Sequence, residues 1–180
     1  MIRIARRPAG WVPPGPAPVA PLERPELWPV DGEDLCLLAG DWRILQKRRG
    51  HRWSLDDLVT AAFAADVAGE TPPAHILDLG CGIGAVLLLL AWRFPSARLV
   101  GVEAQAESAA LACRSIAWNG CGDRCEVRVA DMRDPAPVAV GGFDLVTGTP
   151  PYLPLGTATV PRREEQPGCH LELRGGLEDY

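Results

Sequence analysis

Three glycines at alternate positions form the segment of this sequence best suited to binding a ligand. Gly80, Gly82 and Gly84 follow Asp78 between two apolar segments. Glycine lets the backbone approach a ligand closely, and the start of a helix supplies free N–H groups. We therefore expect a nucleotide-like ligand at this turn. With Ala85 the same residues also satisfy the dinucleotide pattern G-x-G-x-x-G/A, so the turn alone does not identify the ligand.

Two acidic residues that end later apolar segments suit the same ligand. Glu103 follows an expected strand at 98–102, where a carboxylate would accept hydrogen bonds from ribose hydroxyls of either NAD or S-adenosylmethionine. Asp131 follows an expected strand at 125–130, where it could accept from an exocyclic amino group such as that of adenine. A glycine turn that only packs a helix on a strand is the alternative, and the position of Glu103 argues against it.

The segment Thr149-Pro150-Pro151-Tyr152 follows the last apolar run and could hold a planar amine. Two prolines remove two N–H donors and stiffen the backbone, which leaves the carbonyls of Thr149 and Pro150 to accept hydrogen bonds. Two acceptors on an adenine amino group favour a pyramidal nitrogen and stabilise its developing positive charge, while the Tyr152 ring fixes the base plane. A plain turn with a surface tyrosine is the alternative. Hydride transfer, as in a nucleotide dehydrogenase, has no use for this segment.

Positive charge is concentrated toward the amino terminus. Residues 1–52 hold nine Lys and Arg against six Asp and Glu, whereas residues 53–180 hold nine against seventeen, within a net charge of -5. A polyanion such as RNA would meet the first part, because the second repels phosphate. An ordinary solvated face is the alternative. The densest cluster consists of Lys47, Arg48, Arg49 and Arg52.

A hairpin and a helix are predicted before the glycine turn. Gly40-Asp41 separates two apolar runs within residues 35–47, which is typical of a hairpin. Ser54 can cap a helix over about residues 55–68. Helical spacing places four residues on the apolar face of this helix: Leu58, Ala61, Ala62 and Ala65.

The remaining elements alternate between strands and helices. Apolar strands separated by helices indicate a parallel sheet covered on both faces. We therefore predict an α/β fold with a doubly wound sheet that ends after four parallel strands. The strands are expected at 75–79, 98–102, 125–130 and 143–148, and the helices at 85–94 and 106–118.

Composition limits the other classes of protein. Eight prolines within the first thirty residues predict a flexible tail over residues 1–33, followed by one domain over 34–180. The longest apolar stretch, Ala85–Trp92, is far below the roughly 18 residues of a membrane span. Six cysteines without a secretory signal indicate a reduced, cytosolic protein. Cys121 and Cys125 lack further zinc ligands nearby, so we expect no metal.

Together these motifs resemble the S-adenosylmethionine-dependent methyltransferases that modify exocyclic amines. The segment His51–Asp57 with its preceding hairpin, and the end at residues 175–180, most resemble the bacterial tRNA-valine adenine-N6 methyltransferases. The similarity covers about residues 34–180. It implies a Rossmann-like methyltransferase sheet, S-adenosylmethionine as cofactor and tRNA or other structured RNA as partner.

The resemblance also implies roles for single residues. Gly80, Gly82 and Gly84 would line the methionine part of the cofactor, supported by Asp78. Glu103 would bind the ribose, and Asp131 would hold the adenine amino group. The target-amine pocket would consist of Thr149, Pro150, Pro151 and Tyr152.

Two departures from the family pattern stand out. Thr149 occupies a position where the family has Asn, so a hydroxyl replaces an amide acceptor. The sheet ends after four expected strands, whereas family members have more, which leaves an exposed edge at 143–148. We expect a fragment of a longer product or a truncated gene, whose missing part would cover the last strand and close the pocket.

Three functions therefore remain in competition. The first is an N-methyltransferase acting on an adenine in structured RNA, which the basic cluster favours. The second uses the same pocket on the side-chain amide of a glutamine in a protein factor. The third is a cofactor-binding remnant that docks RNA or a partner without catalysis, which Thr149 and the short sheet keep open.

Overall fold

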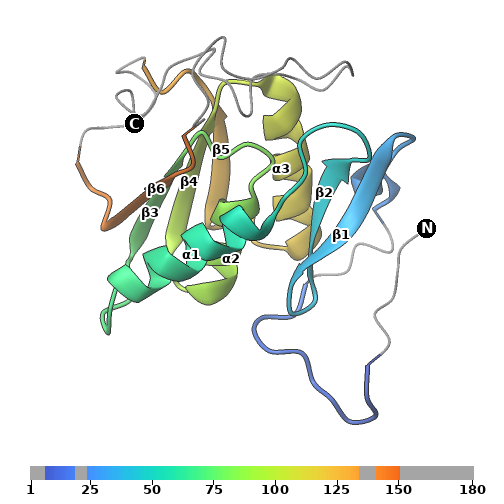
Figure 1. The fold of residues 1–180 in the computed structure, drawn as a ribbon, viewed down its shortest axis with the longest axis horizontal. Helices are drawn as coiled ribbons and strands as arrows, with labels where there is room; N and C mark the ends of the chain where they lie inside the picture. Colours follow the sequence, from blue (N-terminus) through green and yellow to red (C-terminus); the bar gives the residue numbers. More distant parts are fainter. Residues whose placement is uncertain (1–6, 19–23, 134–140, 151–180) are drawn as a thin grey trace.

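The computed structural model describes residues 7–18, 24–133 and 141–150. In these ranges an antiparallel hairpin precedes a four-stranded parallel sheet with its helices (Figure 1). The predicted hairpin is confirmed, with β1 at Glu33–Ala39 and β2 at Trp42–Lys47. A short 3-10 turn, η1 (Pro25–Leu27), lies before it.

Every predicted strand and helix is present, and its ends differ from the prediction by no more than two residues. The strands of the parallel sheet are β3 (His75–Leu79), β4 (Arg98–Glu103), β5 (Cys125–Val129) and β6 (Leu145–Gly148). The helices are α1 (Leu55–Val67), α2 (Ala85–Arg93) and α3 (Ala106–Asn119).

The strand order confirms the predicted doubly wound sheet. The order is β5-β4-β3-β6, and all neighbours are parallel. The chain therefore moves outward from β3 to β5 and then returns to the other side of β3. In such sheets ligands bind at the carboxyl ends of the strands, at the point where the order reverses. That point lies between β3 and β6.

Helices α2 and α3 share one face of the sheet, and α1 packs against α2. The steps from β3 to β4 and from β4 to β5 run in the same direction, so right-handed connections place α2 and α3 on the same side. On that face the register neighbours Ile76, Leu99 and Cys125 pack in one core with the almost entirely buried α2. Helices on both faces were predicted. The other face would be covered from the connection between β5 and β6, part of which lies outside the described residues, so this part of the prediction stays a prediction.

The predicted apolar face of α1 is partly wrong. Ala61 is buried as expected, and the other buried residue of the helix is Ala64, which was not predicted. Two predicted residues lie outside the contact: Leu58 is 43% exposed, and Ala62 is exposed. Small alanine side chains let α1 lie close to α2. The part of α1 that is buried therefore includes fewer residues than the apolar spacing predicted.

The hairpin is held against α3 by two buried polar side chains. Asn119 accepts from the Arg43 N–H at 2.9 Å and donates to the Arg43 carbonyl at 2.7 Å. Ser115 accepts from the Leu45 N–H at 2.9 Å. These side chains pair with the free edge of β2 as a neighbouring strand would. α3 thus lies between the hairpin and the parallel sheet (Figure 1).

Part of the segment predicted as a flexible tail packs on the domain. Leu27 is 5% exposed and belongs to the core. The Trp28 ring meets the Trp118 ring edge-on, with 6.0 Å between centroids. The Arg7 guanidinium forms an ion pair with Asp41 at the tip of the hairpin.

The described part of the chain shows neither a membrane-spanning helix nor a metal-binding cluster. None of its helices is long and apolar enough to cross a membrane. Among the same residues no group of three or more His, Cys, Asp or Glu side chains is arranged to hold a metal ion. The five described cysteines are free thiols, and Cys169 lies outside the described residues.

We expect Asn119→Ala to lower the free energy of unfolding by about 2–4 kcal/mol, because it leaves the N–H and carbonyl of Arg43 without partners. Urea unfolding measures this loss. Cys113→Ser on the exposed side of α3 is the matched control and should change stability by less than about 0.5 kcal/mol. Equal effects of the two variants would show that Asn119 does not hold the hairpin.

Candidate cofactor and substrate site

The parallel sheet brings the described candidate cofactor residues to one edge. Leu79, at the end of β3, is the register neighbour of Val102 in β4 and of Gly148 in β6. Glu103 is likewise the neighbour of Val129 in β5. The glycine turn and the residues after the other three strands therefore begin side by side, as the sequence predicted.

The glycine turn has the conformation that its composition suggests. Gly80, Gly82 and Gly84 have φ values of 62°, 56° and 84°, which L side chains rarely adopt. A Cβ on Gly82 would meet nothing within 4 Å, whereas one on Gly84 would lie 3.1 Å from the Cβ of Ala112. Gly84 therefore serves the packing of α2 on α3, and Gly82 leaves an open approach to the backbone.

Glu103 holds the turn from the neighbouring strand. Its carboxylate accepts from the Gly82 N–H at 2.9 Å through Oε2 and from the Gln105 N–H at 2.7 Å through Oε1. The side chain is buried, at 6% exposure. Each oxygen keeps a further lone pair, so the same carboxylate can accept from two adjacent hydroxyl groups of a ribose.

Asp78 is the most deeply buried acid of the site. It is 2% exposed, and its Oδ1 accepts from the Thr147 hydroxyl at 2.8 Å. Its Oδ2 is buried and has no hydrogen-bond partner among the described residues. Burial raises the pKa of Asp78 to about 7, and the nearby charges of Asp57 and Glu103 add to this rise. Hydrogen bonds from the Thr147 hydroxyl and the Leu87 backbone N–H oppose it.

Asp57 and Thr147 are site residues that the sequence prediction missed. The expected cap at Ser54 is confirmed, and its backbone N–H donates to Asp57 at 2.8 Å in a capping box. Burial also raises the pKa of Asp57. The signals were present: Ser54 and Asp57 have capping-box spacing, and Thr147 is a polar residue within an apolar strand.

The later candidates reach the same edge but differ in what they contact. The Ala130 N–H donates to the Glu103 carbonyl at 3.1 Å, so Asp131 begins beside the ribose candidate. The Asp131 carboxylate accepts from the Arg133 Nε at 2.8 Å. Thr149 is exposed and Pro150 is half-buried, directly after β6. Pro151 and Tyr152 lie outside the described residues.

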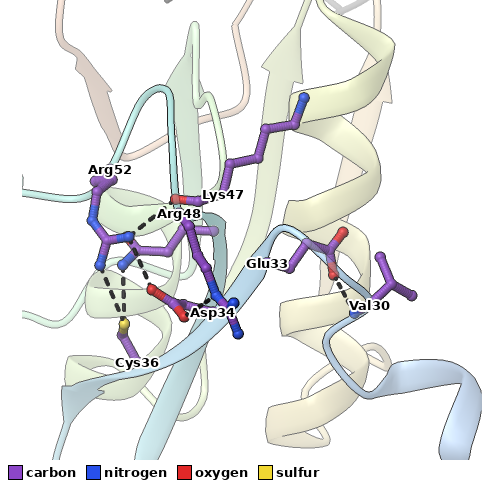
Figure 2. A network of polar contacts seen from close by, with 8 residues as sticks. Val30, Glu33, Asp34, Cys36, Lys47, Arg48 and Arg52 are labelled. Carbon is purple, nitrogen blue, oxygen red and sulfur yellow. Dashed lines mark hydrogen bonds and ion pairs between the residues drawn. The ribbon is translucent and has the colours of Figure 1, made fainter. Parts of the chain in front are cut away.

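The basic cluster is largely engaged in contacts within the hairpin. Figure 2 shows Arg48 and Arg52 turned toward Asp34, at 3.0 and 3.1 Å. These bonds, that of Arg52 first, lower the pKa of Asp34. Lys47 forms an ion pair with Glu107 of α3. Arg49 is exposed and has no ion-pair partner within the described ranges.

The site therefore fits an adenosyl cofactor that carries an amino-acid part. Gly82 offers open space at the backbone, and Glu103 stands where a ribose would be held. The unpartnered Oδ2 of Asp78 is suited to a cationic group.

The comparison with known families gives the same class. Residues 76–155 match the family model described as a methyltransferase domain. These residues, which make up less than half of the chain, are thus similar to a methyltransferase domain, and the resemblance recognised from the motifs is confirmed. S-adenosylmethionine is the cofactor of this class, as predicted.

Two curated proteins are similar to this chain in sequence. A tRNA1(Val) (adenine(37)-N6)-methyltransferase of Porphyromonas gingivalis is 34% identical over 104 residues, which are 56% of this chain and 41% of that protein. A release factor glutamine methyltransferase of Chlorobaculum tepidum is 32% identical over 145 residues, 78% of this chain and 49% of that protein. The chain thus spans less than half the length of these relatives.

A Pyrococcus horikoshii protein, described only as a candidate transferase, shares the fold. The TM-score is 0.50 at 19% identity, over 61% of this chain and 40% of that one.

We expect the stability of the cofactor-free protein to fall as the pH rises from about 4 to about 7. Unfolded Asp78 loses its proton near its ordinary pKa of 3.8, whereas folded Asp78 keeps it until about pH 7, so the folded state binds more protons in this window. Asp78→Asn should remove this loss of stability, which is on the order of 4 kcal/mol. Urea unfolding at several pH values measures it.

Asp56→Asn is the matched control, because Asp56 is exposed on the first turn of α1. This variant should keep the wild-type pH dependence. If Asp78→Asn also keeps it, another group causes the dependence.

Proposed function

We propose that this chain is an S-adenosylmethionine-dependent N-methyltransferase acting on an exocyclic adenine amine in tRNA or other structured RNA. One observation carries the proposal. Gly148 is the register neighbour of Leu79, so the segment that starts at Thr149 leaves the sheet beside the glycine turn. A cofactor held by that turn and an amine held by Thr149 and Pro150 would lie at the same edge.

The cofactor and target residues have separable tasks in this proposal. S-adenosylmethionine, when bound, supplies an electrophilic methyl group on a sulfonium. Asp78 and the open backbone at Gly82 bind its methionine part, Glu103 its ribose and Asp131 its adenine amino group.

The substrate side consists of the segment after β6. The carbonyls of Thr149 and Pro150 accept from the target amine, and Tyr152 stacks on the base beside Pro151. The amine proton leaves to solvent, because the product cation is acidic.

RNA as the substrate is supported by charge and by similarity. The amino-terminal part carries the chain's excess of Lys and Arg. The relative from P. gingivalis is named for a tRNA adenine. The support from charge is weaker for Arg48 and Arg52, because both already form ion pairs with Asp34. Arg49 is exposed. We therefore propose Arg49 as the principal phosphate contact of the cluster.

A protein glutamine is the second candidate substrate. The release factor glutamine methyltransferase of C. tepidum matches 78% of this chain, more than the tRNA enzyme of P. gingivalis does. A glutamine side-chain amide is also a planar nitrogen that carries two hydrogens, so the Thr149 and Pro150 carbonyls suit it equally.

Incubation with methyl-labelled S-adenosylmethionine tests the proposal, with total tRNA in one reaction and total protein in another. We expect label in tRNA, recovered as N6-methyladenosine after nuclease digestion. Glu103→Ala should bind S-adenosylhomocysteine on the order of 1–3 kcal/mol more weakly and lose label in proportion. Label on protein glutamine would favour the second candidate. Cofactor binding without transfer to either substrate would favour a non-catalytic remnant.

Arg49→Ser should weaken RNA binding and reduce the log-log salt slope by about 0.7–0.9, the value for one phosphate contact. Arg48→Ser is the matched control, because Arg48 already pairs with Asp34, and it should change the slope less. Filter binding from 50 to 200 mM salt measures both. Equal slopes for Arg49→Ser and the wild type would mean that Arg49 contacts no phosphate.

A further inference from the structure

Thr147 is a buried hydroxyl in the middle of β6. It is 8% exposed and is the register neighbour of Asp78 in β3. Its Oγ1 lies 2.8 Å from Asp78 Oδ1 and 3.4 Å from the Leu77 carbonyl oxygen. A hydroxyl has one proton to donate, so the shorter contact to the carboxylate is the hydrogen bond.

The hydrogen bond leaves the carboxylate of Asp78 half satisfied. Oδ2 is buried and has no hydrogen-bond partner in the described part of the chain. The ionisable groups whose charges act on Asp78 are Asp57 from α1 and Glu103 from β4, and Asp78 in turn acts on the buried thiol of Cys81 in the glycine turn. The backbone N–H of Leu87, in the first turn of α2, also donates to the carboxylate. None of these groups is a cation, and the first turn of α2 contains only apolar side chains. Within the described ranges the carboxylate therefore lacks a positive partner.

We propose that Thr147 is a positioning residue of the cofactor site, whose hydroxyl fixes the Asp78 carboxylate so that Oδ2 can accept from the ammonium group of the cofactor's methionine part. This inference rests on the proposed function, because it needs an adenosyl cofactor with an amino-acid end. The hydroxyl acts through Asp78 and need not touch the cofactor itself.

The hydroxyl also favours the ionised form of Asp78. Without it the carboxylate would keep only the Leu87 backbone N–H as a donor among the described residues, while burial and the charges of Asp57 and Glu103 would remain. A hydrogen bond to a charged group changes a pKa by about one unit or more. Loss of the hydroxyl should therefore move the titration of Asp78 upward by about one pH unit.

The first test uses the cofactor-free protein. Urea unfolding from pH 4 to pH 9 measures the free energy of unfolding, which falls as the pH rises because of Asp78. The pH at which this fall ends marks the titration of folded Asp78. Thr147→Val, which removes the hydroxyl and keeps the shape, should move that end upward by about one pH unit. Thr147→Ser and Thr147→Ala differ from each other only by the hydroxyl, so the serine variant should keep the wild-type position and the alanine variant should shift. This pair carries the test if the valine variant does not fold.

The second test measures S-adenosylhomocysteine binding by calorimetry over the same pH range. At pH 7 about half of wild-type Asp78 is ionised, against about a tenth after an upward shift of one unit, so the hydroxyl-free variants should bind about fivefold more weakly. At pH 9 the difference should almost vanish. Titration of the ligand's own amine affects all variants equally and leaves these ratios unchanged.

The outcomes separate this inference from the proposed function. If the wild type binds no S-adenosylhomocysteine, the proposed function is wrong. If the wild type binds and the hydroxyl-free variants show the same pH profiles as Thr147→Ser, the role of Thr147 is wrong and the proposed function stands. A loss of affinity that is equal at pH 7 and pH 9 would also overturn it, because a merely structural defect does not depend on the charge of Asp78.

Discussion

Two buried carboxylates at the ends of neighbouring strands are the constraint on which the site depends. Asp78 and Glu103 are 2% and 6% exposed, and their like charges act on each other. Glu103 is balanced by two backbone N–H groups, from Gly82 and Gln105, so its charge also fixes the shape of the glycine turn. Asp78 accepts from the Thr147 hydroxyl and from one backbone N–H, that of Leu87, and its Oδ2 has no partner among the described residues. The turn is thus held from one side and left electrostatically incomplete on the other, as a site for a ligand with hydroxyl groups and a cation requires.

The hairpin and α3 support this edge from a distance. α3 follows the strand that ends in Glu103, and its own Ser115 and Asn119 hold β2. The hairpin in turn leads into the segment that ends at the Ser54 cap of α1, from which Asp57 acts on Asp78. A change in the position of β2 would therefore affect the site in two ways: through α3, which follows Glu103, and through the start of α1, which carries Asp57.

Local signals predicted most of the fold and much of the site. Apolar runs bounded by glycine and proline located the strands and helices, and the ends of parallel strands must lie along one edge, so Glu103 and Asp131 could be placed beside the glycine turn. Thr147 was missed because its role depends on a strand 69 residues away in the sequence. The same limit explains Asn119, which has the sequence of an ordinary helix end but pairs with a strand.

Charge along the sequence was a weaker guide than charge in the structure. The amino-terminal excess of cations suggested a surface for phosphate, yet Asp34 forms ion pairs with both Arg48 and Arg52, and Glu107 forms one with Lys47. Each ion pair that RNA would have to break reduces the electrostatic part of binding. Among the described residues of this cluster Arg49 alone remains exposed without an ion pair. If RNA is the substrate, its recognition by this domain would depend less on a broad basic surface than on the shape and hydrogen bonds of the edge that follows β6, where we propose that Thr149 and Pro150 accept from the target base.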